Sequence, residues 1–234
     1  MQRASERPEL LDGPLDGDLL KGNLRDMARV NRWLGGAHLS WRALERAWPA
    51  DTPAGAPLRL LDVGTGRADI PLFLLERAAR AGRALEIVAT DVRPEIVALA
   101  KRMTAGRPGL TVEQSPAGII DRPEASFDVV HASLVLHHLE PPAATGLLAE
   151  MARLSRGTVV VNDLVRARHW WLAAWLLSRV ATGNSYTRHD APLSVRRSYQ
   201  PAELERLAAA AGLRREALLT DRLRHRYALL LRRG

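Results

Sequence analysis

The sequence predicts an α/β fold with a doubly wound, mostly parallel, seven-stranded sheet, a C-terminal antiparallel hairpin and N-terminal helices. Short apolar runs alternate with helical stretches from residue 58 to residue 212, and two further apolar runs near the C-terminus are close enough to pair as a hairpin. The composition agrees with this fold. In 234 residues, 47% are hydrophobic and 26% are charged, which is enough for a sizeable core.

The expected strands and helices follow one another in regular order. Parallel strands are expected at 58–63, 85–90, 110–113, 127–132 and 158–162. Helices are expected at 69–82, 94–106, 142–155, 168–181 and 201–212, and the hairpin strands at 213–219 and 227–231. Strands alternating with helices of this length are typical of a parallel sheet that is covered on both faces.

Residues 1–57 are expected to form an N-terminal arm and helices, ahead of one structural unit at 58–234. Breakers such as Asp12-Gly13-Pro14 predict a loosely packed arm over 1–22. Apolar spacing then predicts a helix from Asn23 and a second one over 39–48. A second segment without clear periodicity, at 182–200, is expected to be irregular and polar.

Composition excludes several classes of protein. There is no cysteine, which excludes disulfides and thiolate metal sites and leaves only His, Asp and Glu as possible ligands. No metal is expected. The N-terminus lacks an apolar core of a secretory signal, and the longest apolar run, 170–177, is too short to span a membrane, so a cytoplasmic protein is expected. The net charge of +8 comes from dispersed arginines, which makes nucleic-acid binding an unfavoured explanation.

The turn after the first strand carries the strongest chemical signal. It contains Gly64 and Gly66 of a dinucleotide-type loop, but Asp69 stands where the third glycine would be, and a carboxylate there would repel a pyrophosphate. S-adenosylmethionine has no phosphate and carries an ammonium and a sulfonium, so acidic neighbours suit it. Asp62 can orient its amino group, and Asp91, at the end of the second strand, can accept hydrogen bonds from both ribose hydroxyls.

These motifs resemble those of the class I S-adenosylmethionine-dependent methyltransferases. The resemblance runs through Leu61-Asp62-Val63-Gly64-Thr65-Gly66, Thr90-Asp91, Phe127-Asp128-Val129-Val130 and Leu136-His137-His138-Leu139, in the family's order and spacing over about 58–163. It implies a Rossmann-like fold and S-adenosyl-L-methionine as cofactor, held by Asp62, Gly64, Thr65, Gly66, Asp91, Val92, Ser115 and His131. Two positions depart from the family pattern. The third small residue of the turn, usually glycine in this family, is Ala68 here. The segment Gln114-Ser115-Pro116-Ala117 lacks the acid that the family often has beside adenine.

The acceptor site is expected in the insertion at about 164–200 and at the strand ends beside it. Candidates for a general base are His137, His138 and His189. Candidates for acceptor binding are Asp163, His189, Arg196 and Tyr199. For the histidines the alternative is a packing or capping role, and for the segment it is a solvated loop.

The resemblance implies methyl transfer to an oxygen or carbon of a small aromatic, polyketide or quinone-like molecule, as in secondary metabolism. One alternative is an RNA methyltransferase, supported only by charge, because His131-Ala132-Ser133-Leu134 stands where an Asn-Pro-Pro-Tyr-like motif would be. Another is a non-catalytic partner subunit with the cofactor fold. The Trp-rich helix at 168–181 is expected to serve as core or as a homodimer contact, to wall an aromatic or lipid-like pocket, or to rest on a membrane surface.

Overall fold

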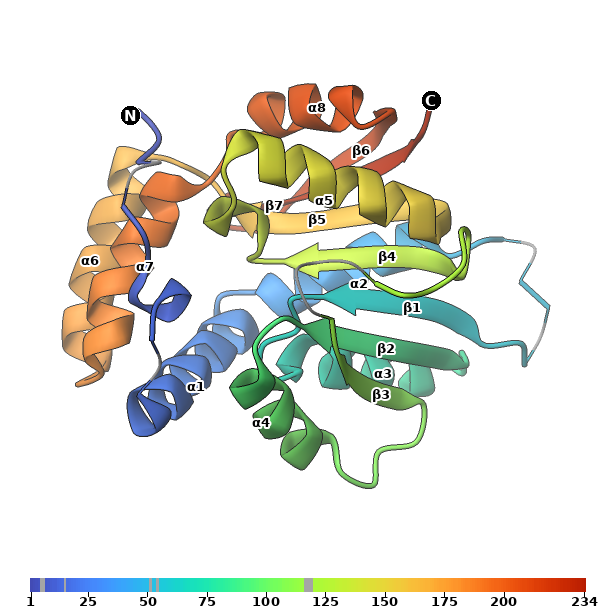
Figure 1. The fold of residues 1–234 in the computed structure, drawn as a ribbon, viewed down its shortest axis with the longest axis horizontal. Helices are drawn as coiled ribbons and strands as arrows, with labels where there is room; N and C mark the ends of the chain where they lie inside the picture. Colours follow the sequence, from blue (N-terminus) through green and yellow to red (C-terminus); the bar gives the residue numbers. More distant parts are fainter. Residues whose placement is uncertain (5–6, 15, 51, 54, 116–119) are drawn as a thin grey trace.

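The computed structural model describes residues 1–4, 7–14, 16–50, 52–53, 55–115 and 120–234, and one seven-stranded sheet organises them (Figure 1). The strand order is β3-β2-β1-β4-β5-β7-β6. The strands are β1 Leu58–Val63, β2 Leu85–Asp91, β3 Leu110–Gln114, β4 Phe127–Ser133, β5 Ser155–Leu164, β6 Leu213–Thr220 and β7 Arg226–Arg233. The first five pair in parallel, while β7 runs antiparallel to both β5 and β6, so the predicted fold class is confirmed.

Helices cover both faces of this sheet. The face that carries Leu58 and Leu60 packs against α2 (Gly36–Ala47) and α3 (Asp69–Arg80). The face that carries Leu61 and Val63 packs against α5 (Pro141–Leu154) and α8 (Pro201–Ala210). Beyond these, α4 (Pro94–Thr104) covers β2 and β3. The strand order reverses between β1 and β4, which is where an open α/β sheet places its ligands.

The N-terminal residues correct the sequence-based expectation of a loose arm. Helix α1 begins at Gly17 rather than at Asn23, because the Asp16 carboxylate caps it by accepting from the amides of Asp18 and Leu19. Ahead of it, a single 3-10 turn, η1 (Leu10–Asp12), is held by the Asp190 carboxylate, which accepts from the Leu10 and Leu11 amides. Long-range hydrogen bonds therefore compensate for the breaker-rich composition of this segment.

The prediction of an irregular segment at 182–200 is also wrong. This stretch forms α7 (Ser185–Arg197), which lies beside α6 (Arg168–Ala181) at the edge formed by the carboxyl ends of the parallel strands (Figure 1). The Asn184 side chain caps α7, and the helix continues through Pro192 at the loss of one backbone hydrogen bond. None of the helices in the described part of the chain is long and apolar enough to cross a bilayer.

Candidate active site

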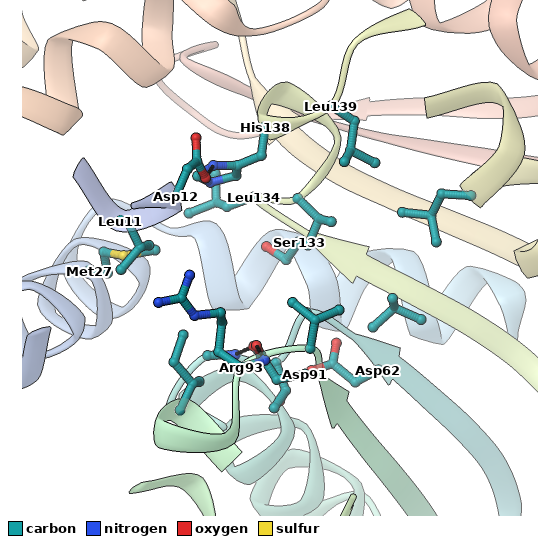
Figure 2. Close-up of a pocket in the computed structure, with 18 of the residues that line it drawn as sticks. Leu11, Asp12, Met27, Asp62, Asp91, Arg93, Ser133, Leu134, His138 and Leu139 are labelled. Carbon is teal, nitrogen blue, oxygen red and sulfur yellow. Dashed lines mark hydrogen bonds and ion pairs between the residues drawn. The ribbon is translucent and has the colours of Figure 1, made fainter. Parts of the chain in front are cut away.

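A cavity of about 1040 Å³ opens at the carboxyl ends of β1, β2 and β4 (Figure 2). The turn after β1 forms its floor and is fixed by glycine. Gly64 and Gly66 adopt φ angles of 68° and 58°, and a Cβ atom at Gly64 would lie 2.5 Å from the Val135 Cγ2 atom. The backbone is thus bare where a ligand approaches it, as the sequence predicts.

Asp91 is anchored by the main chain at the end of β2. Its carboxylate accepts hydrogen bonds from the backbone amides of Gly66 and Arg93, both at 3.1 Å. Burial raises the pKa of this carboxyl, although the two amide hydrogen bonds act against that effect. The carboxylate still lines the cavity, so its remaining acceptor capacity is available to hydroxyl groups of a bound ligand.

Asp62 is held by a buried chain of polar side chains behind the cavity. The Asp62 Oδ1 atom lies 2.6 Å from the Nδ1 atom of His131, whose Nε2 atom lies 2.9 Å from the Ser40 Oγ atom. The Asn162 side chain donates to that same hydroxyl and to the Gly36 carbonyl. His131 faces α2 and not the strand edge, so it reaches the cavity only through Asp62.

The polar atoms of this cavity fit a nucleoside and amino-acid ligand. Thr65 Oγ1 and Ser133 Oγ are buried and have no hydrogen-bond partner among the described residues, and both residues line the cavity. Of the predicted cofactor residues, those that line it are Asp62, Gly64, Thr65, Gly66, Asp91 and Val92. Ser115 does not. It is buried beside β2, where its amide donates to the Asp91 carbonyl.

A second cavity, of about 590 Å³, lies between α1, α6 and α7 and is largely apolar. Its walls include Met27, Val30, Ala173 and Leu177. Three polar residues that lie close together also line it, namely Glu9, His137 and His138. Four residues line both cavities: Leu11, Met27, Leu134 and His138.

Each histidine of this cluster is oriented by its own carboxylate. The His138 Nδ1 atom lies 2.8 Å from Asp12 Oδ1, and the His137 Nδ1 atom lies 2.8 Å from Asp163 Oδ1. The Nε2 atoms of both rings face the Glu9 carboxyl, at 3.7 Å from His137 and 3.8 Å from His138. These ligand atoms all lie within 4.8 Å of one another, so the cluster also has the composition of a metal site.

The acids around the two histidines differ in protonation. Burial alone would raise the pKa of Asp163 and of Asp12, but the partner imidazoles outweigh it and lower both values. Glu9 lies farther from both rings, and burial outweighs the opposing effects of His138 and of the Ser194 hydrogen bond, so that its pKa rises from 4.5 to about 7. Asp12 and Asp163 are therefore the ionised partners of His138 and His137.

None of the four predicted acceptor residues lines either cavity. The exposed His189 ring pairs with Asp190, with 2.7 Å between Nδ1 and Oδ1. Buried Tyr199 donates its hydroxyl hydrogen to the Leu139 carbonyl at 2.7 Å. Arg196 is half-buried on α7 and contributes to neither lining. The predicted Asp163 acts through His137 and does not itself line either cavity.

Sequence reasoning missed three residues at this site. Glu9 and Asp12 come from the N-terminal arm, and Arg197 lies next to the predicted Arg196. The Arg197 guanidinium donates to the carbonyls of His137 and His138, which fixes η3 (Leu136–His138). The one local signal is the Glu9-Leu-Leu-Asp12 spacing, which forms a capping box around η1.

Comparisons with known proteins identify the family. Residues 60–157 match a family model described as a methyltransferase domain. A demethylmenaquinone methyltransferase of Thermus thermophilus is 30% identical over 202 residues, covering 78% of this chain and 86% of that enzyme. One from Deinococcus radiodurans is 39% identical over 104 residues, 43% of this chain but only 40% of that enzyme. A crystal structure of an S-adenosylmethionine-dependent methyltransferase from Aquifex aeolicus shares the fold, with a TM-score of 0.64 at 18% identity over 93% of this chain and 98% of that one.

A doubly wound sheet whose first two strands carry Asp62 and Asp91 at their carboxyl ends, around a turn with no room for a side chain at Gly64, defines a methyltransferase of class I. The chain belongs to the class I S-adenosylmethionine-dependent methyltransferase family, and it is an enzyme of that type.

Proposed function

We propose that this enzyme methylates an oxygen or a carbon of a small, oxygenated aromatic or quinone-like acceptor, with His138 as the general base. The observation that carries the proposal is the position of His138, which lines both the cavity of the cofactor motifs and the apolar cavity. A group at this junction touches the acceptor where it meets the methyl donor. The names of the two curated relatives support a quinone-type acceptor.

The acceptor's polar end belongs beside Glu9, His137 and His138. Since the rest of the second cavity is mainly apolar, an aromatic ring with an apolar substituent would fill it while its oxygen atoms bond to this cluster. Buried Arg226 also lines the cavity, and its guanidinium adds positive charge that favours an electron-rich oxygen. Burial lowers the pKa of Arg226 to about 10, so it stays charged at neutral pH.

The bound cofactor supplies a methyl group that its sulfonium makes electrophilic. The enzyme's own residues then have two tasks, alignment and removal of the acceptor proton. His138 Nδ1 faces the ionised Asp12, so its proton is held there and the Nε2 lone pair is left for the acceptor. As the acceptor O–H proton passes to Nε2, Asp12 stabilises the imidazolium. The deprotonated acceptor would then carry, on its oxygen or on a conjugated ring carbon, the electron pair that takes the methyl group. The bond between that methyl group and the cofactor sulfur would break, and a neutral thioether would leave.

His137 is a positioning residue in this scheme. The Asp163 carboxylate fixes the ring by accepting a hydrogen bond from the His137 Nδ1–H group. It also accepts one from the His137 backbone amide, at 3.2 Å. Its Nε2 atom therefore points into the apolar cavity and can accept a hydrogen bond from a second acceptor hydroxyl. The same arrangement serves O- and C-methylation, because a phenol must lose its proton before either atom becomes nucleophilic.

Mass spectrometry tests the proposal most directly. Purified enzyme is incubated with cofactor labelled in its methyl group and with cell extract or hydroxylated naphthoquinones, and products heavier by one labelled methyl are sought. We expect such a product with the wild-type enzyme and its loss with His138→Ala. A labelled RNA in place of a small molecule, or full activity of His138→Ala, would contradict the proposal.

A further inference from the structure

The outer surface of α6 and its surroundings expose large apolar side chains. Trp33 is 81% exposed and Val180 is 84% exposed. Together with four other exposed residues they form a surface that we call the α6 face, made of Trp33, Leu172, Leu176, Leu177, Val180 and Leu223. Apolar side chains this exposed contribute nothing to the core, so the α6 face requires another explanation.

Helical spacing explains why α6 has more apolar surface than its cavity needs. One stripe, which includes Ala173, Leu177 and Ala181, lines the second cavity. A second stripe of Leu172, Leu176 and Val180 recurs every four residues beside the first and is exposed. In Figure 1, α6 lies outside α7 and at the far side of that helix from the sheet. The second stripe thus has no partner within the described part of the chain.

Arginines border the α6 face. The exposed arginines Arg29 and Arg32 precede Trp33 on α1, and the exposed Arg222 and Arg224 flank Leu223. Of these four, Arg29 pairs with Asp26 on the same helix, at 3.2 Å. Neither 168–181 nor 222–224 contains an acidic residue. An apolar surface with a basic border is complementary to an anionic lipid bilayer, which takes apolar side chains below its negative headgroups.

The α6 face is continuous with the acceptor cavity. Trp33, Leu177 and Leu223 are exposed and also line that cavity. The apolar wall of the cavity therefore extends to the protein surface at the α6 face, where the exposed Arg29 also belongs to the lining. An apolar acceptor dissolved in a bilayer can enter there without its apolar part crossing water.

We propose that the α6 face docks this enzyme peripherally on an anionic lipid surface. The inference goes beyond the proposed methyl transfer, since it depends on neither the acceptor nor the general base. Leu176 and Val180 enter the acyl boundary, and the four arginines contact headgroup phosphates. A second copy of the chain is the alternative occupant, but two like-charged arginine borders would then face each other.

The test is co-sedimentation of the full chain with large vesicles, without acceptor or cofactor. One set of vesicles is phosphatidylcholine alone, and the other is phosphatidylcholine mixed with phosphatidylglycerol. We expect binding to the mixed vesicles that weakens as salt rises. The double variant Leu176→Asp/Val180→Asp should bind the mixed vesicles at least about tenfold more weakly than the wild type. It removes the apolar insertion and adds two negative charges that the headgroups repel.

A matched double variant controls for charge. Met103→Asp/Leu218→Asp alters two other exposed apolar residues, on α4 and β6, and should bind as the wild type does. Circular dichroism confirms that all variants are folded. No binding of the wild type, or equal loss in both double variants, would overturn the proposal. So would a dimer in sedimentation velocity that only Leu176→Asp/Val180→Asp dissociates, since the α6 face would then be a subunit interface.

Discussion

The Nδ1 atom of His138 lies 2.8 Å from the Oδ1 atom of Asp12, a residue 126 positions earlier in the chain. The N-terminal arm thereby supplies the carboxylate that orients the imidazole at the junction of two cavities. A second set of contacts also holds the arm, because Arg3 donates to the carbonyls of Leu139 and Arg197, both at 2.7 Å. The cofactor motifs and the residues proposed to act on the acceptor thus come from distant parts of the sequence.

The Asp12–His138 pair should govern turnover and not cofactor binding. Asp12→Asn removes the charge that stabilises the imidazolium and should lower kcat by about 10- to 100-fold. His138→Ala should lower it by about 100-fold or more, the usual contribution of a general base. Calorimetry should show nearly unchanged cofactor affinity for both. His189→Ala is the matched control, since its exposed ring lies outside both cavities, and a loss of turnover there equal to that of His138→Ala would contradict this assignment.

The sheet and cofactor turn were predictable because their signals are local. A strand of alternating or continuous apolar residues, a glycine-rich turn and an acid at a strand end are all visible within a few residues, as at Asp91. The roles of Glu9 and Asp12 were not predictable, because breaker residues around them predict a loose arm and only distant partners such as Asp190 hold it. His131 shows the same limit, since the pleat turns its ring toward Ser40 on α2.

Helix α7 was missed for a different reason. Pro192 and a run of polar residues weaken its helical pattern, and its helical form depends on the Asn184 cap and on packing against α6. Tertiary packing here outweighs intrinsic preference. The consequence for the site is a shift of one residue, because Arg197 and not Arg196 faces the first cavity.

Asp91 should determine cofactor affinity. Asp91→Ala removes hydrogen bonds from ribose hydroxyls to a carboxylate and should weaken binding of S-adenosylmethionine by about 1.5 to 3 kcal/mol. Titration calorimetry measures this directly. Asp128→Ala is the control, because that carboxylate accepts from the Arg59 amide at the opposite edge of the sheet. Equal effects of the two substitutions would mean that the ribose is bound elsewhere.

Asp69 should prevent binding of NAD, a cofactor that contains a pyrophosphate. Burial raises its pKa, while the hydrogen bond donated by Asn31 at 2.9 Å acts against the increase. It lies at the first turn of α3 and lines the first cavity, where a pyrophosphate would meet a carboxylate. NAD should therefore show no measurable heat of binding under conditions that give micromolar-range binding of S-adenosylmethionine, and tighter binding of NAD would contradict the cofactor assignment.

His131 should act on the cofactor through Asp62. His131→Leu leaves the buried Asp62 carboxylate without its 2.6 Å partner and should weaken cofactor binding by about 10- to 100-fold, as loss of a supporting hydrogen bond does at other sites. At saturating cofactor, kcat should change little. His131→Gln, which retains a donor, should recover part of the affinity. A fall in kcat with unchanged KM for the cofactor would place His131 in the chemical step instead.

Glu9 should make the stability of the enzyme depend on pH. Its carboxyl has a pKa near 4.5 when unfolded and about 7 when folded, because burial, together with the charges of Asp190 and Asp12, disfavours its ionised form more than His138 favours it. Between these values the folded state binds more protons, so the free energy of unfolding falls as pH rises through this window and the loss is complete above about pH 7. At about 1.4 kcal/mol per pH unit, the loss amounts to about 3.5 kcal/mol at most.

Glu9→Gln removes this titration because an amide does not ionise. We therefore compare the free energy of unfolding of the variant with that of the wild type at each pH. This difference, variant minus wild type, should be about 2 to 3 kcal/mol larger at pH 8 than at pH 5. Urea denaturation of both proteins at pH 5, 6 and 8 measures it. Asp18→Asn is the control, because its side chain is 94% exposed and its removal should shift all three curves equally. If Glu9→Gln also gave a constant difference at every pH, the pKa of the Glu9 carboxyl would not be raised by folding, and the proposed pH dependence would be wrong.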